Sequence, residues 1–359
     1  MTLPTPRPVI AAMPRYVPGA RGSQLEEPPI KVSSNETPLG PLPSVTEAIS
    51  RAGAQANRYP DMFAVELTER IAEHHALTPG QVVVGGGSVG VLGHILQAYT
   101  SPGDEVVFAW RSFEAYPILT QVAGATPVPV PLTADARHDV PALTAAVNER
   151  TKVLLLCSPN NPTGPTIRQE EFDAVMRAVP EHVLVVLDEA YVEFVTDSAT
   201  VDGRAALDAY PNLMVLRTFS KAFGLAGLRV GYGLGPEQLM TPVRACVTPF
   251  SVSAVAQAAA MASLDVEAEL RARVDAVVAE RERVLASLNV DGWTPPAAQG
   301  NFFWLAAGEH TGDLAVHLRG HHPSILGRPF EGEGIRISVG EPHENDAVIA
   351  ALATFPHRV

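Results

Sequence analysis

The chain has 359 residues, 46% of them hydrophobic and 18% charged, which predicts a globular protein with a large buried core and excludes a disordered chain. Its formal net charge is −13 and no run of lysine or arginine stands out, so we expect no nucleic-acid partner, because phosphate backbones require clustered positive charge. Two cysteines, Cys157 and Cys246, cannot build a disulfide framework, and we expect both to be buried free thiols.

The N-terminal segment is rich in proline and polar residues, and we expect residues 1–33 to form an extended arm. This segment lacks the long apolar region of a signal peptide, and no apolar stretch of the chain approaches membrane-spanning length. We therefore expect a cytoplasmic protein without a membrane partner. The eleven histidines show no metal-ligand spacing, so we expect no metal.

Beyond the arm, short apolar runs alternate with amphipathic segments. We expect helices over residues 43–56, 65–75, 89–99, 141–148 and 170–178. We expect strands over residues 82–84, 104–108, 126–130, 152–156, 183–187, 213–216 and 230–234, the last of them a candidate antiparallel strand. Each strand is apolar throughout rather than alternating, which is typical of a mostly parallel sheet covered by helices on both faces. The predicted fold class is α/β.

The C-terminal part of the chain predicts a second, smaller α/β unit. Residues 253–288 are rich in Ala, Glu and Arg and read as one or two connecting helices. A strand over 301–305 follows, then helices over 311–318 and 344–355, with Thr311 as an expected N-cap and the segments 325–330 and 334–339 between the two helices. We expect a large domain over residues 34–255 and a small domain over 256–359, which also includes part of the N-terminal arm.

Chemically active side chains follow the carboxyl ends of the expected parallel strands. Ligands of open α/β sheets bind at this edge, and five candidates converge there: Ser88, Phe113, Asn161, Asp188 and Lys221. This convergence is the strongest physical signal in the sequence, and it predicts a ligand site at that edge.

Two of these segments suit an anion. A strand, the glycines at 85–87, Ser88 and a helix follow one another, and free N–H groups at a helix start bind anions. A glycine-rich turn without a ligand is the alternative. The segment 218–229 places two hydroxyls, Lys221 and Arg229 after a strand, which suits a phosphate and an amine nucleophile. A surface loop with basic residues is its alternative.

Asp188 directly follows an apolar strand, where a carboxylate is costly unless it is paired. It is therefore a better functional candidate than most acids of the chain, whereas Glu189 is expected to be a structural partner for a cation. Arg336 alternates with isoleucines, so on a strand it points to the face opposite theirs. It is either a salt-bridged residue at the rim or a two-pronged carboxylate ligand.

The motifs NPTG at 161–164, DEAY at 188–191 and SKAFGLAGLR at 220–229 occur in this order, and together they resemble the fold-type-I aminotransferases that use pyridoxal phosphate. The segments SNE at 34–36, RYPD at 58–61 and RPF at 328–330, with GIRISVG at 334–340, resemble the histidinol-phosphate aminotransferase subfamily. The resemblance runs from about residue 16 to residue 355. It implies a large domain with a mostly parallel seven-stranded sheet, a smaller C-terminal α/β domain and an N-terminal arm.

Two segments depart from the histidinol-phosphate enzymes. GSVG at 87–90 stands where those enzymes usually have an acidic residue, and WRSFEAYP at 110–117 replaces their usual Pro-Ser/Thr-Tyr stretch. Both variants are similar to the actinobacterial aromatic (phenylalanine-type) aminotransferases, so the resemblance disfavours histidinol phosphate as the main substrate.

The resemblance implies roles around the cofactor ring. Lys221 forms the Schiff base with the cofactor aldehyde and moves the substrate proton, and Asp188 pairs with the pyridinium nitrogen. Tyr191 and Asn161 hydrogen-bond the phenolic oxygen of the ring, and Phe113 stacks on the ring.

The resemblance also implies the ligands of the phosphate and of the substrate. The implied phosphate ligands are Ser88, the amide of Val89, Thr218, Ser220 and Arg229, together with Tyr59 of a second subunit, which implies an obligate homodimer. The implied substrate ligands are Arg336 and Asn35, which bind the α-carboxylate, Asn161, and Tyr16 from the partner's arm. Arg328 is implied either as an anion contact or as structural support.

The expected reaction is a ping-pong transfer of an amino group between an aromatic amino acid and a 2-oxo acid, for which we expect 2-oxoglutarate. Histidinol-phosphate transamination is the alternative within the subfamily. A decarboxylase or C–S lyase on the same fold is a second alternative, which Arg336 only weakly opposes. A cofactor-binding regulator is disfavoured, because the chain has no helix-turn-helix or basic extension.

Overall fold

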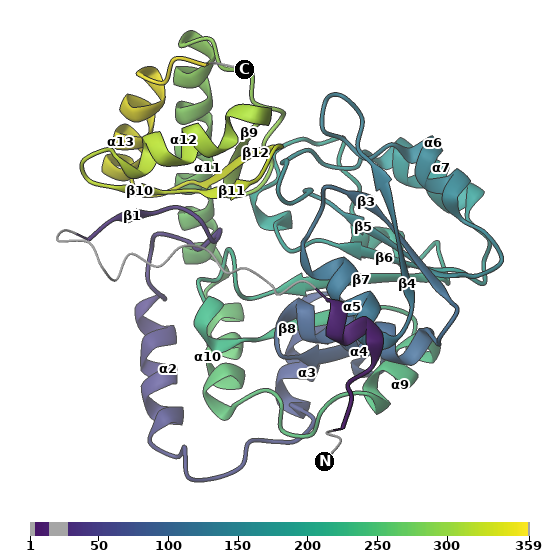
Figure 1. Cartoon of the computed structure of the whole chain (residues 1–359). Coiled ribbons are helices and arrows are strands. Elements are labelled where there is room, and N and C mark those ends of the chain that lie inside the picture. Colours follow the sequence, from purple (N-terminus) through teal and green to yellow (C-terminus); the bar gives the residue numbers. More distant parts are fainter. Residues whose placement is uncertain (1–3, 14–27, 358–359) are drawn as a thin grey trace.

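The computed structural model describes residues 4–13 and 28–357. Within these residues, seven strands form one sheet in the order β2-β8-β7-β6-β5-β3-β4 (Figure 1). Their bounds are Val82–Gly85 (β2), Glu105–Trp110 (β3), Thr126–Pro131 (β4), Thr151–Cys157 (β5), Leu184–Asp188 (β6), Leu213–Thr218 (β7) and Gly231–Leu234 (β8). Strand β8 pairs antiparallel with β7 and with β2, whereas the other pairs are parallel. The predicted mostly parallel sheet and the antiparallel direction of the strand at 230–234 are confirmed.

The central strands are apolar throughout because both faces of the sheet are covered. In β5, Leu154 and Leu156 belong to one core cluster, whereas Val153, Leu155 and Cys157 belong to another. Successive side chains of a strand point to opposite faces, so the two clusters lie on the two faces of the sheet. Each fully buried Leu or Val contributes about 1.5–3 kcal/mol to stability.

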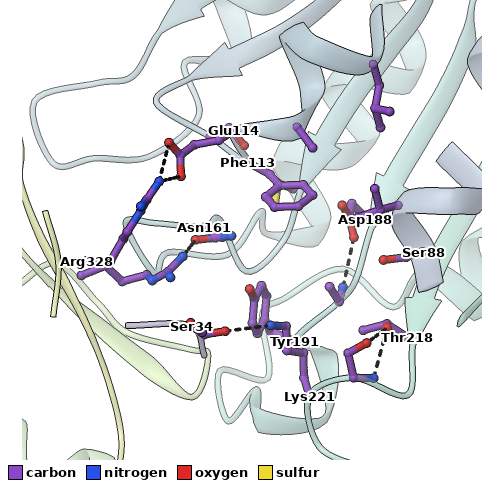
Figure 2. Close-up of a pocket in the computed structure, with 18 of the residues that line it drawn as sticks. Ser34, Ser88, Phe113, Glu114, Asn161, Asp188, Tyr191, Thr218, Lys221 and Arg328 are labelled. Atoms are coloured by element: carbon purple, nitrogen blue, oxygen red, sulfur yellow. Dashed lines mark hydrogen bonds and ion pairs between the residues drawn. The ribbon is translucent and has the colours of Figure 1, made fainter. Parts of the chain in front are cut away.

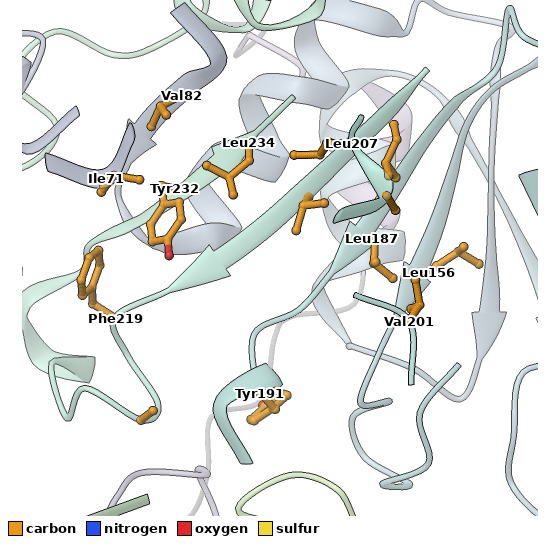
Figure 3. Packing of buried hydrophobic residues seen from close by; sticks show 14 of the residues in the cluster. Ile71, Val82, Leu156, Leu187, Tyr191, Val201, Leu207, Phe219, Tyr232 and Leu234 are labelled. Atoms are coloured by element: carbon orange, nitrogen blue, oxygen red, sulfur yellow. The ribbon is translucent and has the colours of Figure 1, made fainter. Parts of the chain in front are cut away.

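Helices from many parts of the chain cover these two faces. The cluster that contains Leu154, part of which is drawn in Figure 3, is covered by helices with these bounds: Pro43–Gly53 (α2), Val65–His74 (α3), Val140–Ala146 (α6), Gln169–Ala178 (α7), Gly203–Ala206 (α8) and Ala254–Leu264 (α10). The cluster that contains Val153 is covered by Gly87–Tyr99 (α4), Ala115–Ala123 (α5) and Glu237–Ala245 (α9). Helices α5, α8 and α9 are not among the helices predicted from the sequence. Short 3₁₀ turns occupy Pro79–Gln81, Val192–Phe194, Ala226–Leu228 and Gly308–His310.

Strand β4 differs from the expected buried strand. It lies at the edge of the sheet, and Val130 is its one fully buried residue. Three of its six residues are proline, which cannot donate to the ladder and is tolerated at a sheet edge. The expectation that every strand is covered on both faces is therefore wrong for β4.

The C-terminal part of the chain builds a smaller sheet with its own core, at the top of Figure 1. Its strands are antiparallel in the order β11-β12-β9, with bounds Arg328–Phe330, Gly334–Ser338 and Phe302–Leu305. Its helices are Glu267–Val290 (α11), Thr311–Arg319 (α12) and Pro342–Ala353 (α13). Strand β1 (Ile30–Lys31) pairs in parallel with β10 (Ile325–Leu326), which places Ile30 in this second core.

Helix α11 joins the two cores. Its residues Leu270, Val274 and Val277 pack in the core of the large sheet, whereas Val284 and Leu288 pack in the core of the small one. The predicted limits of the domains, 34–255 and 256–359, remain predictions.

Three local expectations are wrong. Residues Pro8–Ala12 form a short helix (α1) rather than an extended arm, because proline at the first helical position costs no hydrogen bond. Thr311 is the first residue of α12 and not its N-cap, because a 3₁₀ turn runs directly into that helix. Cys157 and Cys246 are both free thiols, but Cys246 at the end of α9 is only half-buried.

Over the described ranges, none of the helices has the length and the apolar character that a membrane span requires.

Candidate active site

A cavity of about 440 Å³ lies where the carboxyl ends of the parallel strands face the small sheet (Figure 2). This volume falls in the range of small-molecule sites, about 300–1,000 Å³. The predicted site residues that line it are Ser88, Val89, Phe113, Asn161, Asp188, Tyr191, Thr218, Ser220, Lys221, Arg229, Arg328 and Arg336. The structure therefore brings most of the predicted residues together in one place.

Lys221 follows β7 and projects into the cavity. Its Nζ donates a hydrogen bond to the carbonyl oxygen of Ser34 at 3.2 Å and lies 5.6 Å from the centre of the Tyr191 ring. Desolvation in the cavity, assisted by the positive charge of Arg336, lowers the pKa of Lys221 to about 7. A large fraction of this amine is therefore neutral near neutral pH, which is the form that acts as a nucleophile or base.

Asp188 is the last residue of β6 and is 5% exposed. Its Oδ2 accepts a hydrogen bond from the hydroxyl of Tyr116 at 2.8 Å, and its Oδ1 accepts one from the amide of Ala190 at 3.3 Å. Burial raises the pKa of Asp188 to about 6, and the Tyr116 hydrogen bond opposes that rise. Both of these hydrogen-bond donors are neutral, and the carboxylate lies at the edge of the cavity.

Glu189, the next residue, has a different environment. Its carboxylate accepts hydrogen bonds from Nε of Arg217 at 2.9 Å and from the amide of Gly203 at 3.0 Å. Neighbouring side chains of an extended segment point to opposite sides, so Glu189 is buried away from the cavity that Asp188 lines. The expectation that Glu189 pairs with a cation is confirmed.

Tyr116 was not recognised from the sequence. It lies in the first turn of α5, and its ring packs edge-on against Phe113 with 5.6 Å between ring centres. The signal that could have found it is the spacing of three residues between two aromatics, which places them on one side of a helical turn.

An anion cradle forms around the start of α4. This helix begins at Gly87, two residues earlier than predicted, so Ser88 and Val89 lie in its first turn, where N–H groups are free of helical partners. The hydroxyl of Thr218 donates to that of Ser220 at 3.0 Å, and Nη1 of Arg229 donates to the same Ser220 oxygen at 3.2 Å.

Two glycines allow the parts of this cradle to approach one another closely. A Cβ on Gly87 would lie 2.5 Å from Nη2 of Arg229, and Gly87 has a φ of +79°. A Cβ on Gly231 would lie 2.4 Å from the amide nitrogen of Ser88. Side chains at these positions would push the guanidinium and the helix start apart. The cradle therefore combines helix N–H groups, two hydroxyls and one guanidinium, which is the donor set of a phosphate site.

The polar side chains above Lys221 are linked into a network. Nδ2 of Asn35 donates to the hydroxyl of Tyr191 at 3.0 Å, and Asn161 Oδ1 accepts a hydrogen bond from Nη1 of Arg336. Asn35 is fully buried, and its amide nitrogen donates to Ser338 Oγ at 2.8 Å. Asn35 thus contacts Tyr191 and the small sheet and is not part of the cavity lining itself. Burial raises the pKa of Tyr191, so its phenol is neutral at ordinary pH.

Arg328 and Arg336 are direct neighbours on β11 and β12. Ile335 and Ile337 pack in the small core while Arg336 lines the cavity, which confirms the predicted alternation. Nη2 of Arg336 also donates to the carbonyl oxygen of Ser33 at 2.7 Å. Nη2 of Arg328 donates to both carboxylate oxygens of Glu114, at 3.0 and 2.8 Å.

Besides Asn35, Tyr59 is a predicted site residue that is not part of this cavity lining. Tyr59 is 84% exposed, and its ring lies 4.7 Å from that of Phe250. Its predicted contact is with a second subunit and stays a prediction. Tyr16 lies outside the described residues. Within 4–13 and 28–357, no group of three or more His, Cys, Asp or Glu side chains could hold a metal ion.

The chain is similar to known proteins over nearly its whole length. The family described as Aminotransferase class I and II matches residues 27–352. A protein from Thermobifida fusca named aromatic amino acid aminotransferase is 50% identical, covering 98% of this chain and 97% of that protein, and one of the same name from Cutibacterium acnes is 48% identical, covering 97% of each. Among solved structures, the histidinol-phosphate aminotransferase from Sinorhizobium meliloti in complex with pyridoxal-5′-phosphate has a TM-score of 0.88 and 30% identity over 96% of both chains.

Proposed function

Since the chain belongs to the class I and II aminotransferase family, we propose that it is a pyridoxal-phosphate enzyme that transfers an amino group between an aromatic amino acid and a 2-oxo acid. One observation carries the proposal: Lys221, with its pKa lowered to about 7, and buried Asp188 line the same cavity as the anion cradle. Lysine, acid and phosphate ligands are the protein groups that this cofactor needs.

The residues present fit the cofactor. The cradle of Ser88, Val89, Thr218, Ser220 and Arg229 would hold the phosphate. A side chain at Gly87 or Gly231 would collide with this cradle. The flat face of Phe113 suits stacking on the ring.

The remaining ring contacts are assigned by chemistry. Asp188, whose partners in the protein are neutral, would pair with the ring nitrogen. Asn161 and Tyr191 would donate to the ring oxygen. Bound in this way, the cofactor supplies an electron sink for the bonds at the substrate Cα.

The protein's own residues then position the substrate and move one proton. Lys221 would hold the cofactor covalently in the resting enzyme, and its neutral Nζ would accept the proton of the substrate Cα when the substrate amine has taken its place. Arg336 binds the α-carboxylate, and Asn35 holds Tyr191 in place through its 3.0 Å hydrogen bond. Because the 2-oxo acid product leaves before the second 2-oxo acid enters, the kinetics are ping-pong.

The aromatic substrate class rests on apolar residues of the cavity lining and on the relatives. Ile118, Leu119 and Phe330 give the cavity an apolar surface on which a ring can pack. The relatives at 48–50% identity have names that specify aromatic amino acids. Histidinol phosphate is the second candidate, favoured by the likeness to the Sinorhizobium structure.

A panel of amino donors tests this proposal. Single-turnover reactions of the purified enzyme, followed by the absorbance of the cofactor, give kcat/KM for phenylalanine, tyrosine, tryptophan and histidinol phosphate. The proposal predicts a clear preference for an aromatic amino acid and recovery of the starting spectrum on adding 2-oxoglutarate. A preference for histidinol phosphate would reject the aromatic assignment, and release of carbon dioxide or of a thiol would indicate a decarboxylase or lyase.

The assembly, the compartment and the domain limits belong to the same proposal. We propose a homodimer in which Tyr59 reaches the phosphate of the other subunit, and its 84% exposure supports this role. Light scattering of the purified protein, and a loss of cofactor affinity in Tyr59→Phe, would test it.

The free thiols support a cytoplasmic location, and the two separate cores support the limits 34–255 and 256–359.

A further inference from the structure

An ion pair stands at the substrate end of the cavity. Glu114 directly precedes α5, Arg328 is in β11, and Nη2 of Arg328 donates to both oxygens of the carboxylate at 3.0 and 2.8 Å. The two side chains are 27% and 10% exposed, and both residues line the cavity. The pair is therefore a part of the site surface that is largely shielded from water.

The pair lies away from the phosphate cradle. In Figure 2, Phe113, Asn161 and Tyr191 lie between this pair and the pocket wall with Ser88 and Thr218. The lining near the pair includes Ile118, one helical turn beyond Glu114, and Phe330, whose ring centre is 5.6 Å from Cζ of Arg328. A substrate held at its α-carboxylate by Arg336 would extend its side chain toward this end.

We infer that Glu114 determines the charge of the side chain that the enzyme accepts, an inference that rests on the proposed function and deepens it. An arginine without a carboxylate partner would attract an anionic side chain at this position. The carboxylate of Glu114 neutralises Arg328, so an entering anion must displace it or lie beside a like charge. An uncharged ring leaves the ion pair intact and packs on the apolar wall.

The same reasoning covers the amino acceptor. The second carboxylate of 2-oxoglutarate is an anion at the distal end of the substrate, and it competes with Glu114 for Arg328. Glu114 therefore raises the KM for 2-oxoglutarate.

A neighbouring ion pair provides a matched control. Arg111, three residues before Glu114, pairs with Glu333 in the turn between β11 and β12, so both pairs connect the same two segments. Glu333 and Arg111 are not part of the lining of the cavity. Substituting Glu333 weakens the contact between the segments without changing the charge that a substrate meets.

The test uses Glu114→Gln, which keeps the shape of the side chain and one acceptor for Arg328, with Glu333→Gln as its control. Single-turnover kcat/KM of the holoenzyme is measured for two pairs of donors that differ in charge: phenylalanine with 4-carboxyphenylalanine, and glutamine with glutamate. Glu114→Ala repeats the measurement without any acceptor, and circular dichroism checks the fold of each variant.

We expect the ratio of kcat/KM for the anionic donor to that for its neutral counterpart to rise on the order of ten-fold in Glu114→Gln. The KM for 2-oxoglutarate should fall in the same variant, and both quantities should stay unchanged in Glu333→Gln. An unchanged ratio in Glu114→Gln, or an equal rise in both variants, overturns the inference. A wild-type enzyme that prefers aliphatic donors would refute the aromatic assignment alone, because the glutamine–glutamate pair still tests Glu114.

Discussion

The two walls of the cavity differ in the partners of their charged side chains. On the wall formed by the large sheet and α4, the partners of Lys221, Asp188 and Arg229 include a carbonyl oxygen, a tyrosine hydroxyl and a serine hydroxyl, which are neutral. On the wall formed by the small sheet, Arg328 is paired with the carboxylate of Glu114, whereas its neighbour Arg336 donates to the neutral Asn161 and Ser33 and can bind a substrate carboxylate. Burial shifts the pKa values of Lys221 and Asp188 toward neutrality, whereas the carboxylate of Glu114 compensates the charge of Arg328. We conclude that the first wall, called the chemical wall below, is suited to proton transfer and cofactor binding. The second, called the recognition wall, is suited to selecting the substrate.

The largest effect is expected at Lys221. Lys221→Ala removes the amine that attaches the cofactor and moves the substrate proton, so kcat/KM for the aromatic donor should fall by about 10³-fold or more. Lys152→Ala, a substitution of a half-buried lysine in β5, is the control. Activity of Lys221→Ala within ten-fold of the wild type would contradict the assignment of chemistry to this wall.

The next effect is expected at Asp188. Asp188→Asn keeps the shape of the side chain but removes the negative charge, so it should lower kcat by about 10²-fold or more, because electrostatic stabilisation of the ring is lost. Tyr116→Phe removes only the hydrogen bond to Asp188 and should have a smaller effect, with a shifted pH profile of kcat/KM. Equal effects of the two substitutions would mean that the charge itself is unimportant.

The cradle can be tested through its glycine. Gly87→Ala places a Cβ 2.5 Å from Nη2 of Arg229 at a φ of +79°, so cofactor affinity should fall by about ten- to a hundred-fold. Gly86→Ala is the matched control, because no atom lies within 4 Å of its Cβ. Titration of the cofactor-free protein measures both affinities, and equal losses would show that general strain in the loop is responsible.

A pH effect follows from the burial of Lys221. Its pKa is lowered to about 7, so the reactive neutral amine predominates above pH 7 and is lost as the pH falls below it. The rate of covalent cofactor attachment to the cofactor-free chain should rise about ten-fold from pH 6 to pH 8 and then level off. A rate that continues to rise steeply up to pH 10 would indicate an ordinary lysine.

The chemical wall was predictable because its signals are local. Asn161, Asp188 and Lys221 each follow an apolar run within a few residues, and the common edge of parallel strands brings such positions together. The start of α4, at Gly87, lies two residues before its predicted position, because glycines weaken every helix signal.

The recognition wall depends on contacts between distant parts of the chain. Glu114 and Arg328 are separated by 214 positions, and the contact of Asn35 with Ser338 spans 303. Nothing local marks such partners, since either residue alone is an ordinary polar side chain. The spacing of Tyr116 from Phe113 is a local signal, but its contact with Asp188 is not, because its hydroxyl reaches Asp188 through the packing of α5 on the sheet.

The covalent attachment of the cofactor to Lys221 is the central claim, and the chain suits a direct test because its lysines are Lys31, Lys152 and Lys221. Reduction of the pyridoxal-phosphate-loaded protein with borohydride, followed by peptide mass spectrometry, locates the attached group. The account predicts one added group per chain, on the peptide that contains Lys221. An unmodified Lys221 peptide, or a label distributed over Lys31 and Lys152, would contradict it.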